Sequence, residues 1–305
     1  MQNSTQVVVL QETIRCVESL DERACQQLFW SLREDYDRRA PYISYLIKSR
    51  QTLLSTIAHL DSLLEHLAQD QIICTHNLMT TCVRQYLEKL ESKISSFHGH
   101  FQRLSVSDEK AQLVDRCLSF LYKQMGIEPV WQMANEEQLE YARNVIERNI
   151  FTQIYMLALY PNGDGDVLRD QLLHSHMLKL ADVITPAHND LRIPAIYNSE
   201  CPWSAAQEEV LTINACKTPR EKVACVSRTC TVIMNLLRLA SDRSVPAADD
   251  LFPVLVFVLI KANPPALLST VQYVNSYYEK YFEGEDAYWW TQFCSVVEFI
   301  KTMDY

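Results

Sequence analysis

The scarcity of glycine limits this chain to a small set of folds. Only 5 of its 305 residues are glycine, where average usage would give about four times as many. Tight hairpins, phosphate-binding loops and barrels depend on glycine, because glycine adopts positive φ without steric cost. Hydrophobic residues make up 48% of the chain, enough for a large core. Together these features predict an all-α protein.

Apolar residues recur at alternating steps of four and three through the first half of the chain. The two clearest runs are Leu53-Ile57-Leu60-Leu64-Leu67 and Val83-Leu87-Leu90-Ile94-Phe97. This spacing puts each run on one face of a helix. The other faces are polar, which suits antiparallel helices that cover one another's stripes. Pro41 predicts a new helix start. We expect residues 1–161 to form an N-terminal helical bundle.

A second helical domain is predicted after the turn Pro161-Asn162-Gly163-Asp164-Gly165, which holds two of the five glycines. Thr218-Pro219-Arg220-Glu221 has the cap, proline and glutamate that begin a helix. Residues 251–261 are apolar on nearly every face, which predicts a buried central helix. We expect residues 162–305 to form a layered all-helical domain, with the N-terminal bundle packed on it.

Charge and composition exclude several classes of ligand. The formal net charge is −10, which repels the phosphates of nucleic acids and of anionic lipids. The ten cysteines include no pair with zinc-binding spacing, so we expect reduced thiols in a cytoplasmic protein. The sequence lacks the GxSxG and HExxH motifs of hydrolases, the phosphate-binding P-loop motif and the dinucleotide-binding GxGxxG motif. We expect no metal, no cofactor and no nucleic-acid partner.

The sequence also disfavours a calcium site and a membrane span. The turn at residues 162–166 resembles the first half of a calcium loop, but Val167 and Leu173 occupy the positions that require glycine and glutamate. The longest apolar run, residues 251–260, is shorter than the roughly 20 residues that cross a bilayer. The first residues do not have the pattern of a leader peptide. We expect a chain without a direct transmembrane association.

Two adjacent aspartates, Asp249 and Asp250, precede the apolar helix. The ordinary interpretation is that one of them is the N-cap, whose side chain accepts a backbone hydrogen bond. A helix needs only one N-cap, and neighbouring carboxylates repel each other. One of the two aspartates is therefore available for another role.

Four segments of the second half resemble the signature of the Vps-nine domain family in order and spacing. They are Thr218-Pro219-Arg220-Glu221-Lys222, Asp249-Asp250-Leu251-Phe252-Pro253, Lys261-Ala262-Asn263-Pro264-Pro265, and Gly284-Glu285-Asp286-Ala287-Tyr288 with Thr291. The resemblance covers about residues 150–305, and several motifs in one register make it specific. Members of this family are guanine-nucleotide exchange factors for Rab-five-type GTPases in endocytosis.

The resemblance implies a role for each matching residue. Asp249 matches the aspartate finger, the catalytic carboxylate that enters the nucleotide site of the GTPase. The residues that match GTPase-binding positions are Pro253, Tyr288 and Thr291. The residues that match structural signature positions are Asp250, Asn263 and Pro264.

The function implied is GDP release from a Rab-five-type GTPase, bound most tightly when it is free of nucleotide. Such a protein catalyses exchange without covalent chemistry, and it works in the cytoplasm at endosomal or plasma membranes. One alternative is a non-catalytic helical adaptor for a small GTPase or a coiled coil. Another is a scaffold bundle without a GTPase contact. The N-terminal bundle has two candidate roles, which are bracing the catalytic helices and docking a partner. Bracing is favoured because mutual packing would use up its narrow stripes.

Overall fold

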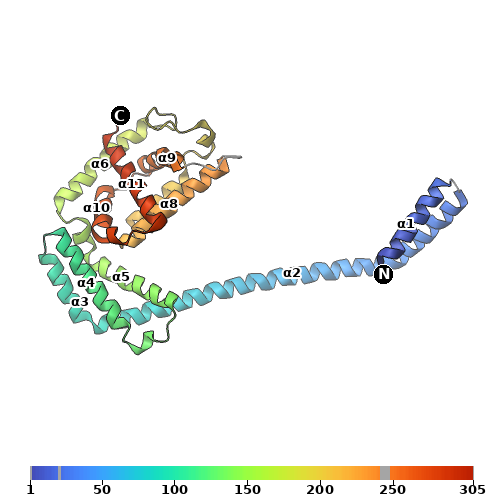
Figure 1. The fold of residues 1–305 in the computed structure, drawn as a ribbon, viewed down its shortest axis with the longest axis horizontal. Helices are drawn as coiled ribbons and strands as arrows, with labels where there is room; N and C mark the ends of the chain where they lie inside the picture. The colour runs from blue at the N-terminus through green and yellow to red at the C-terminus, as the bar shows by residue number, and fades with distance from the viewer. Residues whose placement is uncertain (1, 20–21, 241–247, 305) are drawn as a thin grey trace. The chain divides into compact units, whose positions relative to one another are not determined.

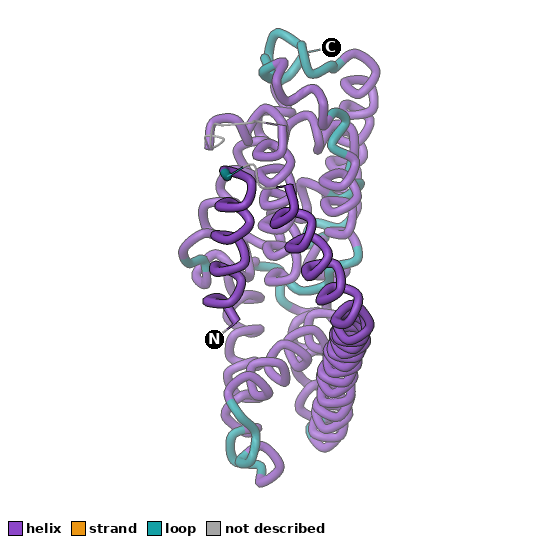
Figure 2. Tube along the Cα trace, turned by 90° about the vertical axis from the view of Figure 1, so that its right-hand side faces the viewer, coloured by secondary structure: helices purple, strands orange, loops and turns teal. Residues whose placement is uncertain are grey.

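A computed structural model describes residues 2–19, 22–240 and 248–304. Throughout these residues the regular structure is helical and no strand is found, which confirms the all-α class (Figure 2). The chain divides into two compact units, Met1–Thr75 and His76–Tyr305. Figure 1 colours these parts from blue to red along the chain.

The first unit consists of α1 (Gln2–Glu18) and most of α2 (Glu22–Lys89), which continues into the second unit (Figure 1). Pro41 lies inside α2, so the expected new helix start at this residue is wrong. The Leu53-to-Leu67 run is not covered, since its five side chains are 52–64% exposed. The expected mutual packing of stripes is therefore wrong for this run.

A helical bundle opens the second unit. It contains the end of α2, α3 (Glu91–Arg103), α4 (Ser107–Met125) and α5 (Glu136–Leu159), and a short 3-10 helix, η1 (Pro129–Trp131), follows α4. The second apolar run is buried here as expected, with Val83 at 1% and Phe97 at 7% exposure. The α3 helix packs on α4 and α5, and α10 (Leu267–Tyr278) packs on α4 and α5 from the C-terminal half. The bundle is thus continuous with the remaining helices of this unit.

The remaining helices form layers around a central one. They are α6 (Asp164–Val183), α7 (Ser204–Leu211), α8 (Pro219–Ala240), α9 (Ala248–Ala262), α10 and α11 (Gly284–Thr302), with 3-10 helices η2 (Ala195–Glu200), η3 (Thr212–Asn214) and η4 (Glu279–Tyr281) between them. The α9 helix packs against α6, α7, α8 and α11. Every residue from Val254 to Ile260 is at most 2% exposed. The prediction of a buried central helix is confirmed.

The start of α8 also matches its prediction. The hydroxyl of Thr218 accepts the N–H of Glu221 at 3.1 Å, and the Glu221 carboxylate accepts the N–H of Thr218 at 3.2 Å. Among the described residues, α8 has the length and apolar composition of a membrane span. In this fold, however, it is a core helix that packs against α7, α10 and α11.

Candidate functional site

The two aspartates at the start of α9 have different surroundings. Asp249 is exposed, and its side chain makes no hydrogen bond or ion pair within the described part of the chain. Asp250 is partly buried and accepts a hydrogen bond from the hydroxyl of Tyr197 at 3.1 Å. Burial, together with this bond, raises the pKa of Tyr197. Of the two carboxylates, Asp249 is the one directed to solvent.

The expectation that one aspartate is the N-cap differs from the structure. The α9 helix begins at Ala248, so both aspartates lie inside its first turn. Acidic side chains in this turn interact favourably with the positive end of the helix dipole. Both carboxylates therefore interact favourably with the start of α9.

Pro253 affects the backbone of the same turn. It lies within α9 and is partly buried. Proline has no N–H, so it cannot donate to the carbonyl group four residues earlier, which belongs to Asp249. The start of α9 thus lacks one backbone hydrogen bond beside the exposed carboxylate of Asp249. The rest of α9 is held in place by its buried side chains.

Tyr288 and Thr291 lie on one face of α11, because residues three apart are neighbours on a helix. Both are exposed, and Tyr288 packs edge-on against Trp289 with ring centroids 4.9 Å apart. Thr291 donates its hydroxyl hydrogen to the carbonyl oxygen of Ala287 at 2.8 Å. These two residues form a small exposed patch that combines an aromatic and a hydroxyl side chain.

The α9 and α11 helices are direct neighbours, but the candidate residues lie at different levels along them. Phe252 near the start of α9 contacts Phe299 near the end of α11, with centroids 5.7 Å apart. Tyr288 lies eleven residues before Phe299, which corresponds to about 16 Å along a helix. The candidate site is therefore an extended surface, as a protein partner requires, and not a single small-molecule pocket.

Asn263 and Pro264 end α9 and tie it to α6. Asn263 adopts a left-handed conformation with φ 47, and its side-chain amide donates to the carbonyl oxygen of His174 at 3.2 Å. Pro264 is buried. One residue before the helix end, the ammonium group of Lys261 donates to the carbonyl oxygen of Ala181 at 2.6 Å. These contacts support a structural role for this signature segment.

Sequence reasoning missed Tyr197 and Lys222. Tyr197 lies in η2, within a proline-containing stretch whose sequence indicates only a loop, and no local pattern links it to Asp250. In the sequence, Lys222 is distinguished only as part of a family motif. It is 1% exposed, and its ammonium group donates to the carbonyl oxygen of Ile213 at 2.8 Å. A lysine that follows a helix start is normally exposed, so its burial depends on tertiary packing.

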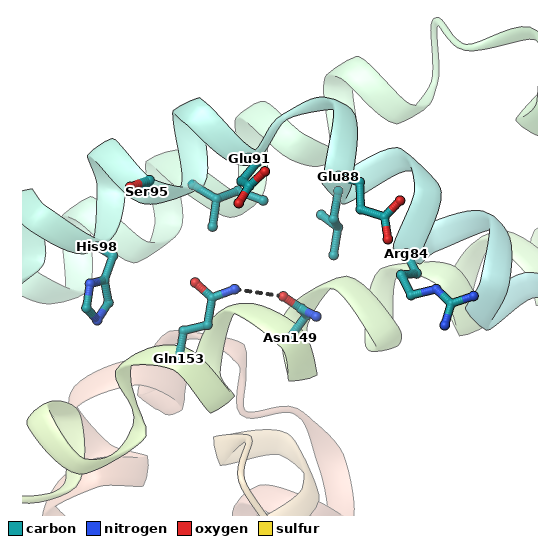
Figure 3. A pocket seen from close by; sticks show the side chains of 9 residues that line it. Arg84, Glu88, Glu91, Ser95, His98, Asn149 and Gln153 are labelled. Atoms are coloured by element: carbon teal, nitrogen blue, oxygen red, sulfur yellow. Dashed lines mark hydrogen bonds between the residues drawn. The ribbon is translucent and has the colours of Figure 1, made fainter.

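A cavity of about 570 Å³ lies between α2, α3 and α5 (Figure 3). Its labelled side chains carry both charges: Arg84, Glu88 and Glu91 lie along one side, and the amide groups of Asn149 and Gln153 on α5 face them. Gln153 donates to Asn149 at 3.0 Å. None of the candidate residues on α9 or α11 lines this cavity. Within the described residues, no group of three His, Cys, Asp or Glu side chains is arranged to hold a metal ion.

Two family models match the chain. Residues 203–305, which contain α7 to α11, match the vacuolar sorting protein 9 (VPS9) domain. Residues 89–155, which contain α3, α4 and most of α5, match a domain of unknown function, DUF5601. The predicted boundary between residues 161 and 162 falls between these two matches and stays a prediction. The chain is a VPS9-domain protein, and the resemblance stated from its motifs is confirmed.

Relatives match the chain over most or all of its length. It is 51% identical over 304 residues to GTPase-activating protein and VPS9 domain-containing protein 1 of Bos taurus, a match that covers 100% of this chain and 22% of the relative. It is 34% identical over 307 residues to receptor-mediated endocytosis protein 6 of Caenorhabditis elegans, covering 96% of this chain and 28% of that protein. It is 33% identical over 216 residues to vacuolar protein sorting-associated protein 9A of Arabidopsis thaliana, covering 69% of this chain and 41% of that protein. The chain thus spans about a fifth of the length of the first of these relatives.

Proposed function

We propose that this chain promotes GDP release from a Rab-five-type small GTPase, with Asp249 as the group that enters the nucleotide site. The observation that carries the proposal is the exposed carboxylate of Asp249, which has no partner among the described residues and extends from the first turn of a buried helix. The carboxylate of its neighbour Asp250 accepts a hydrogen bond from Tyr197. Asp249 is therefore the acidic side chain of the pair that can reach a second protein.

The chemistry is electrostatic. A GTPase holds GDP through its phosphate loop, a lysine and Mg²⁺. A carboxylate that enters this site repels the β-phosphate and pairs with the lysine that the phosphate leaves. Two unit charges 4 Å apart interact by about 4 kcal/mol at an effective dielectric constant of 20. Because each tenfold acceleration needs about 1.4 kcal/mol, one carboxylate can account for roughly a thousandfold faster release.

Exchange of this kind couples two ligands of the same GTPase. If binding of this chain weakens nucleotide binding, nucleotide must weaken binding of this chain by the same factor. The GTPase is therefore bound most tightly when it holds no nucleotide. The excess of cellular GTP over GDP sets the direction. The chain is a catalyst of exchange without covalent chemistry, and it needs no cofactor.

The rest of the contact surface is assigned to the exposed patch on α11 and to Pro253. Tyr288 and Thr291 share one helix face beside α9, and aromatic side chains are enriched among residues that dominate binding energy. Asp250, Asn263 and Pro264 act from within the domain by holding the two ends of α9. A role in endocytosis, in the cytoplasm and at endosomal or plasma membranes, is supported by relatives named receptor-mediated endocytosis protein 6.

Stopped-flow release of a fluorescent GDP analogue from a Rab-five-type GTPase tests the catalytic role. We expect Asp249→Asn, which keeps the shape and removes the charge, to slow catalysed release by roughly a hundredfold or more. Asp164→Asn is the matched control, because Asp164 is also an exposed aspartate in the first turn of a helix, α6. Near-normal release with Asp249→Asn would refute the role. Loss with Asp250→Ala alone would assign it to Asp250.

Binding assays distinguish the exchange factor from the adaptor. An exchange factor binds the nucleotide-free GTPase most tightly, whereas an adaptor that reads the active state binds the GTP form most tightly. Tighter binding to the GTP form, together with unchanged GDP release, would identify a non-catalytic adaptor. Lack of binding to every form would indicate a scaffold.

A further inference from the structure

The α2 helix carries an apolar stripe with the spacing of a coiled coil. From residue 43 to residue 67, positions spaced alternately three and four residues apart are all apolar except one. The apolar residues are Ile43, Leu46, Leu53, Ile57, Leu60, Leu64 and Leu67. An α-helix has 3.6 residues per turn, so a stripe with a repeat of 3.5 residues drifts slowly around a straight helix. Two such helices keep their stripes in contact by winding around each other. The repeat persists for more than three heptads, which is typical of a coiled coil.

This stripe is uncovered in the single chain. Its seven side chains range from 45% exposed at Ile43 to 64% exposed at Leu64 and Leu67. The α2 helix is continuous through this stretch. Contiguous apolar surface of this kind marks an interaction site, and long helices obtain most of their stability from packing of an apolar face. The stripe is therefore a surface for a partner helix.

The residue types at each position indicate a second copy of this chain as the partner. In the heptad abcdefg, leucine occupies four successive d positions, Leu46, Leu53, Leu60 and Leu67. The a positions hold Ile43, Arg50, Ile57 and Leu64. Leucine at d with β-branched residues at a favours two parallel strands. In a parallel pair in register, each d leucine meets its own copy, so the surface is complementary to itself.

Arg50 is the one polar residue in this stretch of the stripe. A single polar residue at an a position specifies register and the number of strands, at some cost in stability. The long stem of arginine can lie along the apolar seam while its guanidinium group reaches solvent. Arg50 thus disfavours alignments that would place it against the leucines of a shifted partner.

The flanking positions add no repulsion between two copies. In a parallel dimer, each g residue faces the e residue five positions later in the other chain, and like charges there would oppose pairing. The facing residues would be Tyr42 with Ile47, Ser49 with Leu54, Thr56 with Asp61, Leu63 with Ala68, and Asp70 with Thr75. No pair joins two like charges, and two pairs are apolar on both sides, which adds apolar contact beside the a and d residues.

We propose that this chain forms a parallel, in-register homodimer through residues 43–67 of α2. The proposal is independent of nucleotide exchange, because neither Asp249 nor the α11 patch takes part in it. It predicts one further contact. Cys74 is exposed and occupies a d position, so an in-register pair brings the two Cys74 thiols together across the seam.

Light scattering coupled to size-exclusion chromatography tests the dimer with the whole chain. The expected mass is twice the 35.4 kDa of one chain. We expect Leu53→Gln with Leu60→Gln to raise the dissociation constant at least about a hundredfold, since two leucines are lost from each side of the seam. Glutamine is a good helix former, and circular dichroism checks that helix content is kept. Ser55→Gln with Ser62→Gln is the matched control, because these residues lie at f positions, away from the seam, with the same spacing.

Cross-linking tests the alignment. Diamide accepts the two electrons and two protons released when two thiols join, and it should give a disulfide-linked dimer of the wild type. Cys74→Ser should abolish this product and keep the doubled mass. A single-chain mass for the wild type, or a dimer unaffected by the two leucine substitutions, would overturn the proposal. A dimer that depends on the leucines but is not linked through Cys74 would overturn the parallel, in-register alignment.

Discussion

Lys222 should make the stability of the second unit depend on pH in the alkaline range. Its side chain is 1% exposed, and its ammonium group donates to the carbonyl oxygen of Ile213 at 2.8 Å. Burial lowers the pKa of Lys222 from 10.5 to about 8. Below pH 8 the folded chain therefore holds a charged lysine in a poorly hydrated place, whereas the unfolded chain holds it in water.

The sign and the size of the effect follow from this pKa. Because the pKa of Lys222 is lower in the folded state, the unfolded chain binds more protons between pH 8 and pH 10.5, and the free energy of unfolding rises with pH there. A shift from 10.5 to about 8 corresponds to about 3 kcal/mol. Between pH 7 and pH 9.5, loss of the buried charge therefore raises the free energy of unfolding by about 2 kcal/mol.

Lys222→Met is the perturbation that isolates this contribution. Methionine keeps an unbranched side chain in the same space and removes the charge. It also leaves the carbonyl group of Ile213 without its donor, which costs about 1–3 kcal/mol. At pH 7 this cost roughly cancels the cost of burying the charge, so the variant should be nearly as stable as the wild type. At pH 9.5 it should be less stable by about 2 kcal/mol.

Urea unfolding followed by tryptophan fluorescence at a series of pH values measures both proteins. The four tryptophans of the second unit are buried, namely Trp131, Trp203, Trp289 and Trp290, so fluorescence reports on that unit. Other groups titrate in both proteins, so their contributions cancel when one free energy of unfolding is subtracted from the other. Lys123→Met, at an exposed lysine of α4, controls for loss of a positive charge. The reasoning fails if the difference between wild type and Lys222→Met is the same at pH 7 and pH 9.5.

Three further predictions concern the helix ends and the contact surface. Thr218→Ala should lower the free energy of unfolding by about 1 kcal/mol, because it removes the N-cap of α8, and Thr218→Ser should restore most of it in urea titrations. Asn263→Ala should be less stable than Asn263→Gly, because alanine resists the left-handed backbone at φ 47 that glycine adopts freely; the reverse order in thermal melts would contradict this. Tyr288→Ala should weaken binding of the nucleotide-free GTPase by about 30-fold, the size of an interface hot spot, while Tyr288→Phe should keep most of the affinity in calorimetry and thereby show that the ring dominates.

Local signals predicted the parts of the fold that depend on neighbouring residues. The α8 start could be predicted because Thr218 and Glu221 satisfy each other's backbone within one turn. The burial of α9 could be predicted because its residues are apolar on every face, so any compact fold must cover them. Proline was a weaker signal. Pro41 lies within a continuous helix, because long helices tolerate one lost hydrogen bond when the rest of the ladder persists.

The parts that failed depend on residues far apart in the chain. An apolar stripe shows that a helix face needs a partner, but not whether the partner belongs to the same chain, and the Leu53-to-Leu67 run illustrates this limit. For the aspartate pair, the capping argument indicated that one carboxylate is available without saying which, and only the family resemblance pointed to Asp249. In the structure the hydroxyl of Tyr197 donates to Asp250 and Asp249 is the exposed carboxylate, and the Tyr197 contact spans a loop whose path no local pattern encodes.

Close packing around α9 restricts where these proteins can diverge. Between Val254 and Ile260 a change of even one methylene group would disturb several neighbouring helices, so this segment offers little freedom to adapt to a new partner. Adaptation to a different partner should therefore fall on the solvent-facing residues of α11, where a side chain can change without disturbing the interior.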